Sequence, residues 1–200
     1  MMEAATGHQK LRLFTGLYLS QEVRRHVADI SAALSEGIKG IRWVPQENLH
    51  VTLKFLGSCD QSVIKDLVET MRKATDYLPL TLTVGGVGAF PSLGSARVIW
   101  VGASDFEGRV DKVYNVLEKG AAKCGFPKEK RPYRPHITIG RARKEPITIT
   151  PEVAGRFDQE LPLEIDEILL FSSQLTSTGT EYTVLERIGR VRPKEQLKRG

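Results

Sequence analysis

The chain has 200 residues, of which 40% are hydrophobic and 26% charged, so it is long enough to bury a hydrophobic core. No stretch is apolar enough to cross a membrane, and the first ten residues lack the apolar run of a secretory signal, so we expect a cytoplasmic protein. The net charge of +5 favours an anionic partner, although part of it lies in a basic tail, residues 190–199.

The first half of the chain predicts strand, helix and strand in that order. A strand is expected at residues 11–19, and Ser20 is a good N-cap for the helix that follows. The apolar residues of this helix recur at helical spacing: Val23, Val27, Ile30 and Leu34. A second strand is expected at residues 49–56. Asp60 or Ser62 then opens another helix, and residues 80–84 return as a strand.

The same order begins again in the second half. Residues 85–94 are rich in glycine and proline and predict a turn, after which residues 97–101 form a strand. Ser104 with Glu107 predicts a capping box, and Gly125 ends the helix. The apolar stripe of this helix is Phe106, Val110, Val113, Leu117, Ala121 and Cys124. Later strands are expected at residues 134–140, 163–171 and 182–188, with a polar turn at residues 172–179.

The repetition of strand, helix and strand has nearly constant spacing. Arg12 precedes His50 by 38 residues, and Arg97 precedes His136 by 39. The chain is therefore predicted to fold as an α+β protein with two pseudo-symmetric lobes, whose antiparallel sheets flank a central cleft. We expect one bilobal domain over residues 11–190, a disordered tail at residues 1–10 and a basic tail at residues 191–200.

A four-residue motif occurs twice, as His-Val-Thr-Leu at residues 50–53 and as His-Ile-Thr-Ile at residues 136–139. Polar and apolar residues alternate in both copies, so in each strand the histidine and the threonine lie on one face. Two imidazoles and two hydroxyls of this kind are typical of acid–base chemistry at phosphorus, in which one imidazole accepts a proton and the other donates one.

Strand alternation also sorts the neighbours of these motifs. Asn48 and Lys54 share the face of His50, whereas Arg134 and Gly140 share the face of His136; Arg141 is predicted to face away. We expect Gly140 to leave room for a ligand near the backbone.

The predicted groove contains two histidines, two threonines, Lys54 and Arg134, and neither motif supplies a carboxylate. That composition disfavours a zinc or magnesium site, so we expect neither a metal nor another cofactor. It favours a phosphodiester, whose non-bridging oxygens would accept hydrogen bonds from Thr52 and Thr138. Lys54 or Arg134 would offset the charge of the transition state.

Other features of the sequence are given structural interpretations. His8 and His26 lie outside the matched motifs, and Cys59 and Cys124, which have no metal-site spacing, are expected to be small packed thiols. The glycines of residues 85–88 are not followed by the helix that a dinucleotide-binding loop requires. Three aromatic residues near the motifs fit the core better than base stacking: Trp43, Phe90 and Tyr133.

Four blocks of the sequence, in order, resemble the two-histidine (2H) phosphoesterases, and in particular their RNA 2′,3′-cyclic phosphodiesterase branch, which is also described as 2′-5′ RNA ligases. The blocks are residues 42–57, residues 88–91, residues 133–138, and the pair Ser173-x-Leu175 and Gly179-x-x-Tyr182. The resemblance implies a bilobal fold, no required metal, and hydrolysis of an RNA 2′,3′-cyclic phosphate to a 2′-phosphate. It further implies that His50 is the proton donor and His136 the proton acceptor.

The expected activity is therefore opening of 2′,3′-cyclic phosphates at RNA ends by a monomeric enzyme. One alternative is a ligase that forms 2′-5′ links between tRNA halves, the reverse reaction in the same groove. Another is a module that binds nucleotides or RNA ends without turnover, but binding alone does not require two groups that exchange protons.

Overall fold

The structure, a computed structural model, describes residues 10–177 and 179–190. The elements in chain order are β1 (Lys10–Tyr18), α1 (Gln21–Gly37), β2 (Ile41–Trp43), η1 (Gln46–Asn48), β3 (His50–Asp60), η2 (Gln61–Val63), α2 (Ile64–Ala74), η3 (Thr75–Tyr77), β4 (Leu80–Ser92), β5 (Ser95–Ser104), α3 (Arg109–Lys123), β6 (His136–Ala142), α4 (Pro151–Ala154), β7 (Leu161–Ile165), β8 (Glu167–Leu175) and β9 (Thr180–Gly189). The expected tail at residues 1–9 and the basic tail at residues 191–200 lie outside the described residues, and Lys10 already belongs to β1.

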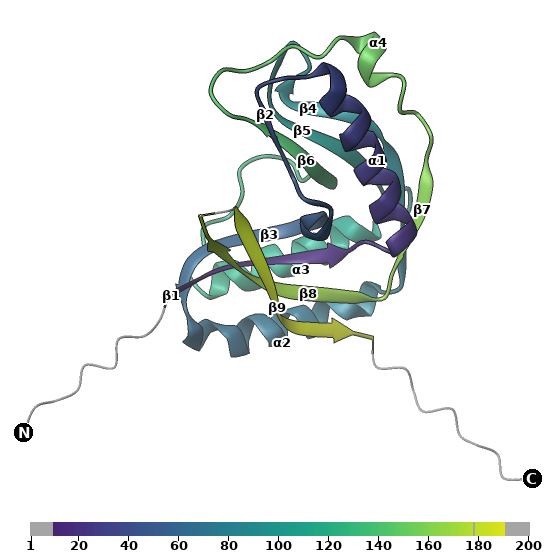
Figure 1. Cartoon of the computed structure of the whole chain (residues 1–200). Helices are drawn as coiled ribbons and strands as arrows, with labels where there is room; N and C mark the ends of the chain where they lie inside the picture. The colour runs from purple at the N-terminus through teal and green to yellow at the C-terminus, as the bar shows by residue number, and fades with distance from the viewer. Residues whose placement is uncertain (1–9, 178, 191–200) are drawn as a thin grey trace, which may run out of the picture.

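The strands form one antiparallel sheet that is almost divided at its centre. Their order is β7-β4-β5-β6-β3-β1-β8-β9, with β2 paired to β6. The central strands β3 and β6 share a single residue pair, Val51 with Ile137. Figure 1 shows the result as two lobes, one built on β3, β1, β8 and β9 and the other on β6, β5, β4 and β7. The predicted two-lobed α+β fold is confirmed.

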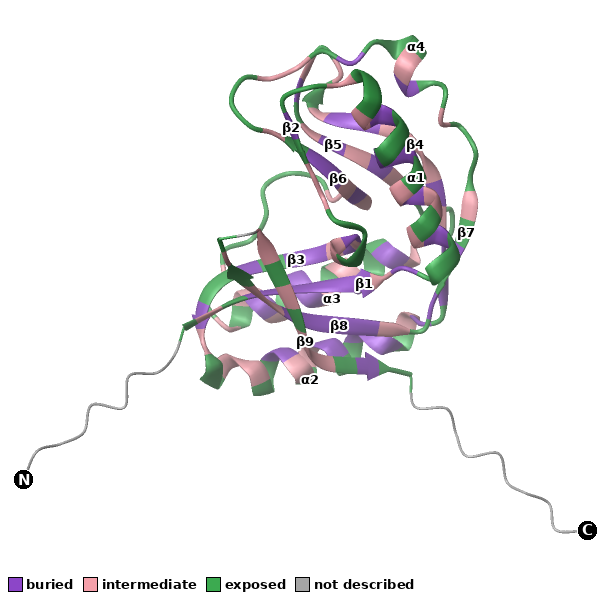
Figure 2. Cartoon of the chain, viewed as in Figure 1, coloured by how far each residue is buried: buried purple, intermediate pink, exposed green. Residues whose placement is uncertain are grey.

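The helices begin and pack largely as the sequence predicts. Ser20 accepts a hydrogen bond from the amide of Val23, and all four predicted apolar positions of α1 are buried. Asp60 accepts from the amide of Ser62 and so caps the turn that leads into α2. Figure 2 shows that the buried faces of these helices lie against the sheet, whereas their outer faces are exposed. Within the described residues no helix combines the length and the apolar character needed to cross a membrane.

The predicted start of α3 is wrong. The helix begins at Arg109, and the cap is not Ser104 with Glu107 but the carboxylate of Asp105, which accepts from the amides of Glu107 and Val110. Gly108 has a φ of +65°, which a glycine adopts at little cost and which interrupts the helical pattern before Arg109. Phe106 therefore lies outside the helix and is 86% exposed, instead of being part of its apolar stripe.

The predicted turn at residues 85–94 is also wrong, because β4 runs through it to Ser92. A β-bulge at Gly86, where φ is +70°, absorbs one glycine. The indole of Trp100 packs directly against the backbone of Gly88, because a Cβ at this position would lie only 2.1 Å from the ring. Towards the C-terminus, the single strand predicted at residues 163–171 is divided between β7 and β8, and β8 continues to Leu175 into the predicted polar turn.

Both cysteines are free thiols, Cys59 buried and Cys124 partly buried, as expected. Burial raises the pKa of each thiol.

Candidate active site

The two His-x-Thr motifs meet at the centre of the sheet. Because β3 and β6 are antiparallel and pair at Val51 and Ile137, His50 comes to lie across from Thr138, and Thr52 across from His136. His50, Thr52 and Thr138 line a cleft of about 440 Å³. The pKa of His50 is sensitive to the charge of His136, which also indicates that the two rings are near each other. The predicted convergence of the two motifs on one site agrees with this geometry.

Each imidazole is held in one tautomer by a backbone carbonyl two residues earlier. His50 Nδ1 lies 2.7 Å from the carbonyl oxygen of Asn48, and His136 Nδ1 lies 2.7 Å from that of Arg134. A carbonyl oxygen can only accept, so Nδ1 carries the proton and donates it in both hydrogen bonds. Nε2 is then the atom that can gain or lose a proton at each ring. In His50 this atom lies 3.0 Å from Thr52 Oγ1.

Aromatic rings surround both histidines. The ring centroid of His50 lies 4.9 Å from that of Phe14 and 5.2 Å from that of Tyr182. The His136 ring lies 5.1 Å from Phe90 and 6.1 Å from Trp100. Burial lowers the pKa of both histidines, and the nearby Arg141 guanidinium lowers both further, against the opposing effect of the carbonyl acceptors. Both rings are therefore neutral at neutral pH.

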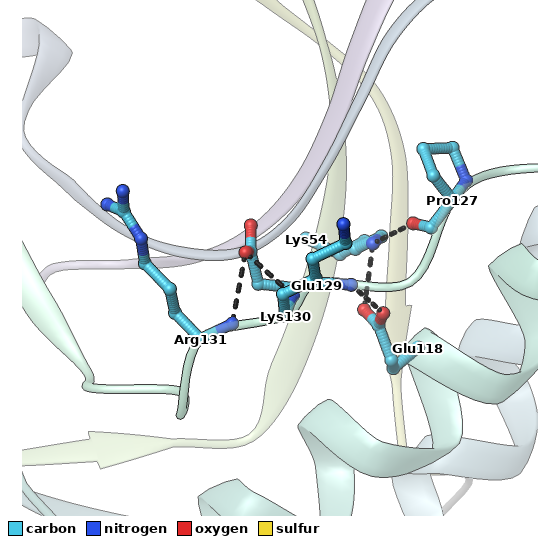
Figure 3. Close-up of polar contacts among 6 residues, drawn as sticks. All are labelled: Lys54, Glu118, Pro127, Glu129, Lys130 and Arg131. Atoms are coloured by element: carbon cyan, nitrogen blue, oxygen red, sulfur yellow. Dashed lines mark hydrogen bonds and ion pairs between the residues drawn. The ribbon is translucent and has the colours of Figure 1, made fainter.

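The prediction that Lys54 faces the groove is wrong. Strand β3 has a β-bulge at Leu53, because Thr52 pairs with Gly16 while Lys54 pairs with Thr15. The bulge reverses the faces of the residues that follow it. As Figure 3 shows, the Lys54 ammonium is directed to the helix side of the sheet, 2.8 Å from the Glu118 carboxylate of α3 and 2.8 Å from the carbonyl oxygen of Pro127. Phe55 takes the cleft side and is 64% exposed.

Strand β6 carries the matching bulge at Ile139, the fourth residue of the second motif. Thr138 pairs with Trp100 while Gly140 pairs with Ile99. The bulge directs Arg141 to the cleft, so the prediction that Arg141 faces away is wrong. The space beside Gly140 is filled by Ile41 and Trp43 of β2 instead of being open to a ligand, because a Cβ at Gly140 would lie 2.7 Å from the Ile41 side chain.

Arg134 contributes to the site through its backbone. Its side chain is exposed and is not among the residues that line the cleft, whereas its carbonyl oxygen holds His136. The structure thus does not place the Arg134 or the Lys54 side chain beside the two threonines.

Sequence reasoning missed the cations that do line the cleft. Arg12 of β1, Arg42 of β2 and Arg141 of β6 come together there, and all three lower the pKa of Tyr182 against the raising effect of its burial. Arg42 and Tyr182 belong to the sequence blocks quoted above, which was the available signal. Among the described residues no carboxylate lines this cleft, and no cluster of three histidine, cysteine or acidic residues could hold a metal ion.

Comparisons with known proteins show the family of the chain. The family model described as LigT like Phosphoesterase matches the chain twice in succession, over residues 17–100 and 101–182. The RNA 2′,3′-cyclic phosphodiesterase of Archaeoglobus fulgidus is 33% identical over 177 residues, which cover 86% of this chain and 96% of that protein. The protein of the same name from Thermotoga maritima is 32% identical and covers 88% of this chain and 93% of its own length.

Solved structures of similar proteins share the fold of this chain. A protein of Thermus thermophilus superposes with a TM-score of 0.77 at 26% identity, over 90% of this chain and 97% of its own. E. coli LigT complexed with 3′-AMP superposes with a TM-score of 0.76 at 27% identity, over 92% of this chain and all of its own. The duplicated match, the histidine pair and the two-lobed fold together show that this chain belongs to the LigT-like phosphoesterase family.

Proposed function

We propose that this protein hydrolyses 2′,3′-cyclic phosphates at the ends of RNA to 2′-phosphates, with His50 and His136 as the catalytic residues. The observation that carries the proposal is the pair of imidazoles whose Nδ1 atoms both donate to backbone carbonyls, which leaves both Nε2 atoms for proton transfer. His50 lines a cleft with three arginines, and His136 lies on the neighbouring strand across from Thr52. The curated relatives named RNA 2′,3′-cyclic phosphodiesterase support the same substrate class.

The chemistry is an in-line displacement at phosphorus. A water oxygen bonds to phosphorus while the bond between phosphorus and the ribose 3′ oxygen breaks. His136 Nε2 takes the proton of the water, and protonated His50 Nε2 gives a proton to the departing 3′ oxygen. The carbonyl oxygens of Asn48 and Arg134 stabilise each imidazolium in turn, because both accept from Nδ1. The assignment of donor and acceptor follows from the family resemblance.

Thr52, Thr138 and Arg141 are the residues that we assign to the phosphate. The two hydroxyls are positioned to donate to non-bridging oxygens, and the Arg141 guanidinium offsets the charge that develops on them. A bound phosphodiester anion also counteracts the effect of Arg141 on the histidines and raises the protonated fraction of His50.

Two exposed apolar side chains in the cleft are suited to the terminal nucleoside. Phe55 is 64% exposed and Leu175 is 67% exposed, although both are large and apolar. An unstacked RNA base can cover such side chains, because each base has an apolar face. We therefore assign Phe55 to contact with the base at the reacting end.

The test is incubation with an RNA oligomer that ends in a 2′,3′-cyclic phosphate, with excess chelator, and identification of the product. We expect a 2′-phosphate at an undiminished rate, because the cleft offers no carboxylate among its described residues to hold a cation. His50→Ala and His136→Ala should each lower kcat by about a hundredfold or more while leaving the fold intact. Loss of activity with chelator and its return with a divalent metal would contradict this mechanism.

We further propose that the protein acts as a monomer in the cytoplasm. The two free thiols support a reducing compartment. Light scattering of the purified protein and fractionation of expressing cells test these two points.

A further inference from the structure

The loop between α3 and β6, residues 124–135, is a strongly basic segment of the described surface whose charged side chains have no role in the mechanism. It is called the basic loop below. Between residues 128 and 134 it has four cations and one carboxylate, a net charge of +3. The cations are Lys128, Lys130, Arg131 and Arg134, and all four are exposed. None of them takes part in an ion pair within the described part of the chain.

The backbone of the basic loop is fixed at its first half by a buried ion pair. Lys54 Nζ donates a hydrogen bond to the carbonyl oxygen of Pro127. Glu118, the ion-pair partner of Lys54, accepts from the amide of Glu129 at 2.6 Å. The Glu129 carboxylate accepts in turn from the amides of Lys130 and Arg131. Figure 3 shows this network, from which the Arg131 side chain extends away. The single carboxylate of the loop is thus engaged by the loop's own backbone.

The second half of the basic loop is tied to the active site. The Tyr133 ring stacks on Tyr114 at a centroid distance of 4.2 Å, and its hydroxyl donates to the carbonyl oxygen of Thr52. The carbonyl oxygen of Arg134 accepts a hydrogen bond from His136 Nδ1. Because Arg131 is five residues before His136, its Cα lies within about 18 Å of that of the catalytic histidine. The loop is therefore near enough to the cleft to meet phosphates of an RNA strand whose end lies there.

We propose that the basic loop binds the phosphate backbone of the RNA strand on the 5′ side of the reacting nucleotide. This inference rests on the proposed function, which places the cyclic end in the cleft. A loop whose backbone is already ordered loses less conformational entropy on binding, and unpaired cations are available to phosphates. The loop therefore distinguishes a long RNA from a cyclic mononucleotide, which has no further phosphates to contact.

The test compares two substrates and two triple variants. Lys128→Ala/Lys130→Ala/Arg131→Ala removes three charges from the basic loop but keeps Arg134 and Glu129. Lys65→Ala/Arg72→Ala/Lys73→Ala removes three exposed charges from α2 and serves as the control. Initial rates are measured with 2′,3′-cyclic AMP and with a ten-nucleotide RNA that ends in a 2′,3′-cyclic phosphate, at several salt concentrations.

We expect the loop variant to leave kcat and KM for the cyclic mononucleotide within twofold of wild type. Its KM for the oligomer should rise about tenfold or more at about 0.1 M salt. The slope of log(1/KM) against log[salt] should become shallower by about 2, because each contact to a single strand contributes about 0.7. The α2 variant should behave as wild type with both substrates.

Three results would overturn the inference: no change in the loop variant, an equal change in both variants, or an equal loss with both substrates. The first excludes contact, the second indicates an effect of net charge alone, and the third indicates a disturbed active site. If the wild-type protein cleaves neither substrate, the proposed function fails, and anisotropy of a labelled 2′-phosphate RNA oligomer still measures binding by the loop. Equally tight binding of polyglutamate would assign the loop to an acidic protein partner and not to RNA.

Discussion

Replacing Lys54 separates the two possible roles of this residue. The side chains of Lys54 and Glu118 are 8% and 11% exposed, and their charged atoms lie 2.8 Å apart. Removing one member of a buried ion pair leaves the other charge buried without compensation, at a cost of about 3–5 kcal/mol. We therefore expect Lys54→Met to lower the free energy of unfolding by about that amount, measured from urea denaturation. A lysine on an open groove would contribute less than about 1 kcal/mol.

The double variant Lys54→Met/Glu118→Leu is the matched control. Both charges are then absent and apolar volume replaces them, so we expect at least half of the lost stability to return. The amide of Glu129 and the carbonyl of Pro127 lose their side-chain partners, but water can reach both because the two residues are exposed. If Lys54→Met keeps wild-type stability and loses activity, Lys54 belongs to the groove and the ion pair is unimportant.

Three further predictions concern the site and the packing of β4. The pH profile of kcat/KM should be a bell whose optimum lies below pH 6.5, because burial and Arg141 lower the pKa of both histidines. Arg141→Met should move both limbs of the bell to higher pH. An optimum above pH 7 in the wild type would contradict this reasoning. Thr52→Val and Thr138→Val keep the branched shape and should each lower kcat by about a hundredfold, whereas unchanged kinetics would make both threonines simple strand formers. Gly88→Ala should destabilise the fold by about 1–3 kcal/mol in urea denaturation, because the added Cβ overlaps with Trp100. Gly94→Ala should be near neutral, because a Cβ there has no neighbouring atom within 4 Å. Equal effects of the two variants would refute the packing argument.

The alternation of polar and apolar residues predicted the site only as far as the third residue of each motif. His50, Thr52, His136 and Thr138 precede the bulges, so their faces could be read from the sequence. Leu53 and Ile139 are ordinary strand residues, and nothing in them marks an extra residue in the ladder. The two bulges removed Lys54 from the groove and brought Arg141 into it. The wrong assignments of Lys54 and Arg141 therefore have one physical cause.

Local signals in the helices succeeded or failed for equally specific reasons. Ser20 was predicted as an N-cap because serine is preferred there and an apolar stripe at helical spacing follows, and its hydroxyl accepts from the amide of Val23. At α3 the predicted cap, Ser104 with Glu107, failed because the positive φ of Gly108 delays the helix to Arg109, where the Asp105 carboxylate accepts from the amide of Val110. In residues 85–94 the glycines allow a bulge and the approach of Trp100, and both depend on pairing with the next strand, β5, which local turn signals do not show.

Two helices pack against the lobe opposite to the strand that precedes them, and this explains how a nearly divided sheet can hold one active site. Strand β1 belongs to the lobe of β3, but α1, which follows it, packs against β6; strand β5 belongs to the lobe of β6, but α3, which follows it, packs against β3. Each helix therefore buries its apolar stripe in the lobe opposite to its preceding strand. Since β3 and β6 share only one residue pair, sheet hydrogen bonds do little to fix the angle between the lobes. The relative position of His50 and His136 is set instead by core packing under α1 and α3, where the Lys54–Glu118 pair lies.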